Sequence, residues 1–347
     1  MTDMTPYRQM LFQNAEDLLK IDSPTGFTHK VAGYLRQKAE HLGFPCEQTQ
    51  KGCIMINIPG RDPSKTVLIS GHVDTLGLMV RSVTEDGMLK FTLIGGPIVP
   101  TLDGEYCRIH TRAGSIYTGT ILSLSPSAHV YPDCKTRERS PAEMAVRLDM
   151  PVRKKEDVEK LGIRPGDFIC IDPKTQITEN GFLKSRFIDD KGGSACMLTL
   201  AEILSKENRK PAFHTILFFS VFEEVGHGAS FLPPEVSEML AVDMGCIGDD
   251  LSCTEYDVSI CAKDSSGPYD YDMVSRLISL AEQNGIKFAV DIYPQYGSDV
   301  SAALRGGNNI HGALIGPGVH ASHGMERTHW DGLSNTLALM LAYVDAL

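Results

Sequence analysis

The spacing of apolar residues changes along the chain, and each spacing predicts a different kind of element. Apolar positions recur at helical intervals over residues 5–20 and again over 31–42, and "DSPTG" at 22–26 separates these two predicted helices. Short apolar runs at 53–58 and 66–70 then predict strands. The first part of the chain is therefore expected to form two helices followed by two strands.

The pattern becomes short, alternating and rich in turns from about residue 76 to residue 175. Segments such as "SIYTGTILSL" and "DFICID" alternate as strands do, and helical periodicity is confined to 154–161. This alternating pattern predicts an inserted β-rich, barrel-like domain of about 100 residues, a common domain size. Residues 1–75 plus 176–347 would then form the main domain.

Strand-like and helix-like segments alternate after residue 180. This alternation predicts an α/β fold with a mixed, largely parallel sheet covered by helices. Ligands of such sheets lie at the carboxyl ends of the strands, so residues directly after strands are the candidates for chemistry. Helices are predicted at 191–206, 270–284, 299–305 and 331–346, and strands at 213–222, 239–245, 256–262, 287–293 and 310–315.

Composition narrows the choice of partners and compartment. The chain has 33 Lys and Arg against 44 Asp and Glu, a formal net charge of −11, which argues against nucleic acid or an anionic membrane as the main partner. Its nine cysteines form no CxxC pair, as expected of reduced thiols in the cytoplasm. The first residues do not resemble a secretory signal, and the longest apolar run, near 215–222, is too short to cross a bilayer.

Histidine and carboxylate residues stand directly after several of the predicted strands. In "LISGHVDTLG", His72 and Asp74 are two positions apart, which at a strand end points both side chains the same way. The carboxylate of Asp74 can then accept the second ring N–H of His72 and fix its tautomer for metal binding.

The strand "FFSVF" is followed by the adjacent carboxylates Glu223 and Glu224, a costly arrangement near a core. One of them can bind a metal and so lose its repulsive charge, while the other holds a proton. A mixture of imidazole nitrogen and carboxylate oxygen ligands suits zinc, cobalt or manganese. A pair of such ions about 3.5–4 Å apart can share one carboxylate. Further candidates are Asp189 and Asp190 before a helix, Asp243 after another strand, and His320, His323 and His329 in one loop.

The order of these motifs resembles a known family. The series HVD, IDD, FEEVG, AVD and SHGME is similar to that of the co-catalytic metallopeptidases with two zinc ions. The β-rich insertion between HVD and IDD resembles the tetrahedral (TET) aminopeptidases, also called deblocking or glutamyl aminopeptidases. The similarity extends over nearly the whole chain, through "DSPTGFTHKVAGYL", "SSGPYD" and "YGSDVSAAL".

The resemblance implies a role for each motif and a cis peptide bond between Asp189 and Asp190. His323 is favoured over His320 as the last ligand, because "HGME" resembles the family's His-x-x-Glu pattern. The implied roles are Asp189 as the bridge between two metals, His72 and Asp243 at one metal, Glu224 and His323 at the other, Glu223 as general base, and Asp74 as the residue that orients His72.

The expected function is a metal-dependent aminopeptidase that releases N-terminal residues from short peptides. Two divalent ions per subunit are expected, zinc first, with cobalt and manganese left open. The inserted domain would be a dimerisation or lid domain, and dimers would assemble into a tetrahedral dodecamer. His129 and His227 are left without a role. The alternatives are a related two-metal hydrolase, such as a carboxypeptidase, aminoacylase or deacetylase, and a non-catalytic, metal-stabilised assembly protein.

Overall fold

The computed structural model describes residues 3–346 and divides the chain into two compact units. The larger unit comprises Met1–Asp74 and Lys174–Leu347, and the smaller one comprises Thr75–Pro173. Each unit has its own sheet system. Among residues 3–346, none of the helices has the length and apolar character that crossing a bilayer requires.

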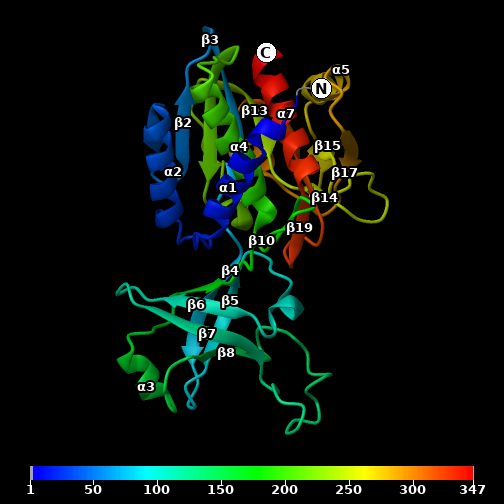
Figure 1. The fold of residues 1–347 in the computed structure, drawn as a ribbon. Helices are drawn as coiled ribbons and strands as arrows, with labels where there is room; N and C mark the ends of the chain where they lie inside the picture. The colour runs from blue at the N-terminus through cyan, green and yellow to red at the C-terminus, as the bar shows by residue number, and fades with distance from the viewer. Residues whose placement is uncertain (1–2, 347) are drawn as a thin grey trace. The chain divides into compact units, whose positions relative to one another are not determined.

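The larger unit is built on a mixed, largely parallel sheet, which confirms the predicted fold class (Figure 1). Strands β12, β3, β13 and β18 run parallel at its centre, and antiparallel strands complete its edges. The strands lie in the order β1 (Cys46–Gln48), β2 (Ile54–Ile58), β12 (Phe213–Ser220), β3 (Asp62–His72), β13 (Val236–Val242), β18 (His311–Val319), β15 (Val258–Asp264) and β16 (Gly267–Pro268); β14 (Gly245–Cys246) pairs with β18 and β17 (Phe288–Ile292) with β15.

The apolar run before Glu223 is strand β12, which lies between β2 and β3. Residues 215–220 are all buried because a central strand of such a sheet is covered on both faces. This explains why the run is continuously hydrophobic rather than alternating.

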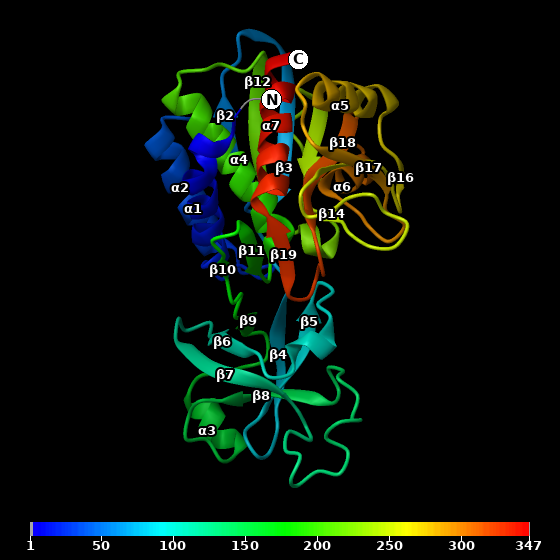
Figure 2. The same ribbon diagram turned by 45° about the vertical axis from the view of Figure 1, so that its right-hand side comes forward.

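Helices cover both faces of this sheet. Helix α4 packs on β3 and β13, α7 packs on β18 and β15, and α6 packs on β13 and β18. Helices α1, α4 and α7 lie side by side in both views (Figure 1, Figure 2). The helical elements of this unit are η1 (Thr5–Tyr7), α1 (Arg8–Leu19), α2 (His29–Leu42), α4 (Ile188–Lys206), η3 (Glu223–Val225), α5 (Tyr271–Gln283), α6 (Asp299–Arg305) and α7 (Trp330–Ala346).

Two glycines show how closely α4 and α6 approach the sheet. A Cβ at Gly71 of β3 would lie 2.8 Å from a sulfur atom of α4, and one at Gly312 of β18 would lie 2.3 Å from a methyl group of α6. Met239 pairs with both Leu68 and Gly312, and Gly71 is three positions from Leu68, so the two glycines point to opposite faces. The missing side chains therefore let α4 and α6 sit directly on opposite sides of the strands.

A second, three-stranded sheet in the larger unit has the order β10 (Gln176–Ile177), β11 (Phe182–Ser185) and β19 (Glu326–His329). Strand β11 pairs antiparallel with β19, with Ser185 opposite Glu326. Because β11 leads into α4, this pairing brings the chain before β19 next to the start of α4.

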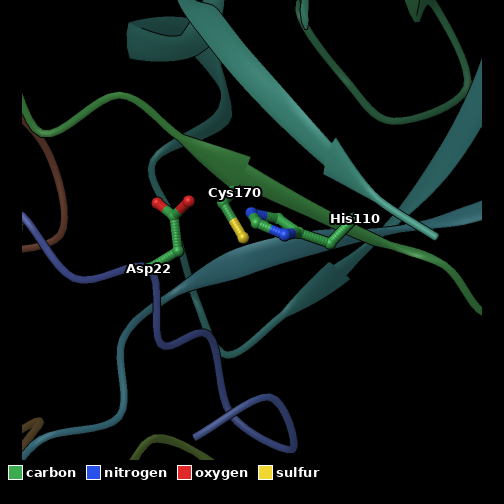
Figure 3. Close-up of side chains that lie close together, drawn as sticks. All are labelled: Asp22, His110 and Cys170. Carbon is green, nitrogen blue, oxygen red and sulfur yellow. The ribbon is translucent and has the colours of Figure 1, made fainter. Parts of the chain in front are cut away.

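The smaller unit is a closed antiparallel barrel with strand order β4, β5, β8, β7, β6, β9. Figure 3 shows His110 of β6 close to Cys170 of the neighbouring strand β9, and both side chains are buried. The elements are β4 (Gly77–Val83), β5 (Leu89–Ile94), η2 (Val99–Leu102), β6 (Tyr106–His110), β7 (Ile116–Ser123), β8 (Met144–Leu148), α3 (Lys155–Lys160) and β9 (Phe168–Ile171).

Candidate active site

The predicted site residues meet at the carboxyl edge of the large sheet, as parallel strands allow. All of them belong to the larger unit. They come from five separate segments: His72 ends β3, Asp189 lies in the first turn of α4, Glu223 and Glu224 form the turn η3 after β12, Asp243 follows β13, and His323 lies between β18 and β19.

Asp189 stands between two imidazole rings. Its Oδ1 lies 3.1 Å from Nε2 of His72, and its Oδ2 lies 3.6 Å from Nε2 of His323. Nε2 of His323 is also 3.9 Å from Oε2 of Glu224. The two oxygens of one carboxylate therefore face two different groups of potential ligands.

Asp243 and Glu223 border the His72 side of this arrangement. Ligand atoms of His72, Glu223 and Asp243 all lie within 4.8 Å of one another, and Nε2 of His72 is 3.8 Å from Oε2 of Glu223. The side chain of Glu223 is 16% exposed, whereas that of Glu224 is only 4% exposed. The two adjacent glutamates thus differ in surroundings: the side chain of Glu223 is the more exposed of the two, and that of Glu224 is nearly buried beside His323.

The donor set fits divalent cations. Zinc bonds of about 2.0–2.1 Å place neighbouring ligand atoms roughly 3.3 Å apart, close to the separations around Asp189. Oε1 of Glu224 is buried and has no hydrogen-bond partner within the part of the chain that the structure describes. An unpaired buried carboxylate oxygen is costly, and a cation would satisfy it.

The pKa values of the clustered side chains also indicate that the site binds cations. Burial raises the pKa values of Glu223 and Glu224 well above the usual range, and burial followed by the charge of Asp189 raises the pKa of Asp243 to about 7. Burial opposes the protonation of His72, but its hydrogen bond to Asp189 and the surrounding carboxylates outweigh this and raise its pKa well above 6.5. So many buried carboxylates need positive charge nearby to remain ionised.

A family model described as M42 glutamyl aminopeptidase matches residues 52–339. The chain belongs to this family. Membership makes it an aminopeptidase, that is, an exopeptidase of the hydrolase class, and it confirms the family predicted from the five motifs. It also favours an aminopeptidase over the related two-metal hydrolases considered from sequence.

Relatives extend over the full length of this M42 aminopeptidase. YhfE of Bacillus subtilis (strain 168), named provisionally as an aminopeptidase, is 44% identical over 344 residues, which cover 99% of each chain. Aminopeptidase APDkam598 from the archaeon Desulfurococcus kamchatkensis has a similar structure, with a TM-score of 0.89 and 22% identity over 98% of this chain and 96% of that one.

The TET1 peptidase of Pyrococcus horikoshii is a second structural neighbour, with a TM-score of 0.84. It is 21% identical, and the match covers 97% of this chain and 100% of that one. That peptidase is described as able to assemble into a tetrahedron or a large octahedral shell. At these identities, the two structural neighbours show a common fold.

Asp74 of this M42 aminopeptidase supports the turn that carries Glu223 and Glu224. Its carboxylate accepts hydrogen bonds from the Thr25 hydroxyl at 2.6 Å and from the Glu223 backbone N–H at 3.2 Å. Nδ1 of His72 lies 2.9 Å from the main-chain oxygen of Asp74 and 3.7 Å from the carboxylate. The nearest acceptor for the ring is therefore the backbone of Asp74, a difference from the sequence expectation that spacing alone does not predict.

Glu326 is a further site residue to which sequence reasoning gave no role. It is buried, and its two carboxylate oxygens accept the backbone N–H groups of Asp189 and His323, each at 3.0 Å. His323 has a φ of 63°, in the left-handed region that residues other than glycine seldom adopt. Glu326 thus ties together two segments of the site and holds this conformation. Its sequence signal was the His-x-x-Glu pattern within "SHGME".

The structure separates His323 from the other histidines of its loop. His320 is exposed and pairs its backbone with Arg327, and Nε2 of His329 lies 2.8 Å from the backbone oxygen of Asn180. Only His323 of these three contacts Asp189 and Glu224 among the ion-pair distances of residues 3–346.

Asp190, His227 and His129 lie outside the set of facing ligands. The peptide bond between Asp189 and Asp190 is cis, as the resemblance implies, and the Asp190 carboxylate accepts the backbone N–H groups of His72 and Gly193. The exposed ring of His227 stacks on Phe222. His129 is exposed and belongs to the smaller unit.

A pocket of about 260 Å³ opens onto the site. Four of the carboxylates described above reach its wall, and residues of the loop before α6 and of α6 itself complete it. Its lining includes Asp189, Glu223, Asp243, Tyr296, Ser298 and Arg305.

Proposed function

We propose that this M42 aminopeptidase releases N-terminal residues from short peptides with the help of two divalent cations. His72, Asp189 and Asp243 would hold one ion, and Asp189, Glu224 and His323 the other. The observation that carries the proposal is the position of Asp189, whose two oxygens lie 3.1 Å and 3.6 Å from two different imidazoles.

Bound divalent ions supply Lewis acidity and make water more acidic in such sites. Glu223 is the general base: it is open to the pocket, and it takes a proton from the attacking water and passes it to the departing amine. The acidic wall of the pocket favours a free α-ammonium group. Only chain ends carry that group, which accounts for exopeptidase rather than endopeptidase activity.

The substrate side chain is proposed to be acidic, with Arg305 as its partner. Arg305 lines the pocket, donates to the Ser266 hydroxyl at 2.8 Å and has no ion pair with a carboxylate in the described chain. With zinc, cobalt or manganese added and the bound metal measured, we expect glutamyl and aspartyl anilides to be cleaved fastest. Arg305→Ala should lower their kcat/KM by about tenfold, since a charged hydrogen bond is lost.

Leucyl and lysyl anilides provide the internal control for Arg305→Ala, because their hydrolysis should change little. Equal losses on every anilide would show that Arg305 does not select the side chain. Cleavage of N-acyl amino acids but not of aminoacyl anilides would contradict the proposed aminopeptidase function itself.

The role of Asp74 is tested by Asp74→Ala. Loss of its carboxylate frees the turn at Glu223 and removes a negative charge 3.7 Å from the His72 ring. We expect zinc affinity to fall by roughly 10–100-fold, the usual effect of a residue that supports a ligand. Competition with a chromogenic chelator measures this affinity, and an unchanged value would count against the role.

We further propose that the chain forms a homo-oligomer through its smaller unit, the barrel unit of Thr75–Pro173. The oligomer would be a dimer, or dimers assembled into a tetrahedral dodecamer. The assembly described for the TET1 peptidase supports this, as do exposed apolar side chains on the barrel unit, including Tyr106, Ile116 and Val130. The mass of the particle in solution distinguishes a monomer from a dimer and from a dodecamer. The nine free cysteines support a cytoplasmic location, where thiols stay reduced.

A further inference from the structure

We propose that Tyr296 is a catalytic residue of the reaction, in addition to Glu223. Its hydroxyl would donate a hydrogen bond to the carbonyl oxygen of the scissile bond as that oxygen becomes negatively charged. The inference rests on the proposed peptidase function and adds a residue with a role that neither the motifs nor the family match assigns.

The position of Tyr296 is fixed from several sides. Its ring packs against that of Tyr293, with centroids 5.2 Å apart, and its backbone oxygen accepts the N–H of Ser265 at 3.1 Å and also the Ser265 hydroxyl. Its own hydroxyl donates to the backbone oxygen of Met244 at 3.1 Å. Met244 directly follows Asp243, so these contacts hold the phenol at the edge of the carboxylate cluster.

The pocket is rich in hydrogen-bond acceptors and poor in available donors. An oxyanion requires donors aimed at the position where negative charge develops, and ionised carboxylates cannot provide them. The Ser298 hydroxyl is buried and already engaged with Tyr269 and with the first turn of α6. His323 faces two carboxylates, and Gln295 and Arg305 are exposed. Tyr296 is the half-buried donor that reaches the cluster.

The Tyr296 side chain can act as a donor at neutral pH. A tyrosine hydroxyl ordinarily ionises only near pH 10, so it keeps its proton throughout the neutral pH range.

The resting hydrogen bond of Tyr296 suits a role specific to the transition state. The hydroxyl donates to the Met244 oxygen, a neutral carbonyl, and the carboxylate of Asp243 is a second acceptor beside it. A neutral substrate carbonyl in the ground state is no stronger an acceptor than these, so the hydroxyl gains little by changing partner. A developing oxyanion is a markedly stronger acceptor, since charge-assisted hydrogen bonds are roughly twice as strong as neutral ones. The interaction would thus lower the barrier without tightening substrate binding.

The test is Tyr296→Phe in the full chain loaded with a measured amount of zinc. Removal of one oxyanion donor typically costs about 100-fold or more in kcat, and we expect a loss of about that size with KM changed by no more than about twofold. Tyr293→Phe is the matched control, because it removes a phenol oxygen from the same aromatic pair. Its hydroxyl contacts Ser259 rather than the pocket, so near wild-type turnover is expected.

A second readout separates a catalytic from a structural role. The affinity for a phosphinic dipeptide analogue of the tetrahedral state should fall in Tyr296→Phe by the same factor as kcat/KM, whereas affinity for the free amino-acid product should not change. Wild-type kcat in Tyr296→Phe would overturn this inference and leave the proposed function standing. Loss of zinc that accounts for the lost activity would also overturn it. An inactive wild-type protein at full metal content would overturn both proposals.

Discussion

Glu223→Gln is expected to lose about 10²- to 10⁴-fold in kcat while it keeps its full metal content. The amide fills the same space but cannot take a proton from water. Glu223 borders the pocket and lies 3.8 Å from His72, whereas the enclosed ligand position beside His323 belongs to Glu224. Anilide hydrolysis and elemental analysis of the same preparation measure the two quantities.

The neighbouring substitution Glu224→Gln is the matched control. Oε1 of Glu224 is buried without a hydrogen-bond partner in the described chain, and Oε2 lies 3.9 Å from His323, so the lost charge should weaken metal binding directly. Glu224→Gln should therefore be purified with less metal and regain part of its activity at high metal concentration. Loss of metal in Glu223→Gln, or normal turnover in it, would contradict the assignment.

Asp189→Asn is expected to abolish detectable activity and to leave at most one divalent ion per chain. Each oxygen of Asp189 faces a different imidazole, so an amide, which has only one acceptor atom, cannot serve both groups of ligands. Isothermal titration of the metal-free protein with zinc measures the stoichiometry, which should be two in the wild type.

Asp190→Asn provides the comparison for this second prediction. Asp190 is buried next to Asp189, but its carboxylate accepts backbone N–H groups from His72 and Gly193 and does not face the histidine rings. Its substitution should lower the melting temperature through a lost hydrogen bond and leave both zinc equivalents in place. Two tightly bound ions in Asp189→Asn would refute the bridging role.

Local patterns were sufficient for the fold class. The unbroken apolar run of β12 and the strand–helix alternation after residue 180 are properties of neighbouring residues, and both led to a largely parallel sheet with helices on it. The alternating segments between 76 and 175 became a closed barrel. Side-chain periodicity depends only on nearby backbone geometry, which is why the sequence is informative at this level.

The supporting contacts of the site could not be predicted in the same way. Glu326 accepts N–H groups from Asp189 and His323 because β19 pairs with β11, and Tyr296 reaches Met244 across 52 positions of the chain. Likewise, spacing placed Asp74 near His72, but only the fold turned its carboxylate toward Thr25 and Glu223. The roles of the individual site residues and of the two units remain predictions.

The sequence by itself determined which kinds of ligand end each strand, and with them the family. The carboxyl ends of parallel strands meet at one edge, so His72, Asp243 and the Glu223–Glu224 pair were expected along the same edge once the sheet was recognised. Tertiary structure alone decided that the two oxygens of Asp189 face two histidines and that the side chain of Glu223 is more exposed than that of Glu224. These choices depend on ångström-scale packing between distant segments, which no local pattern encodes.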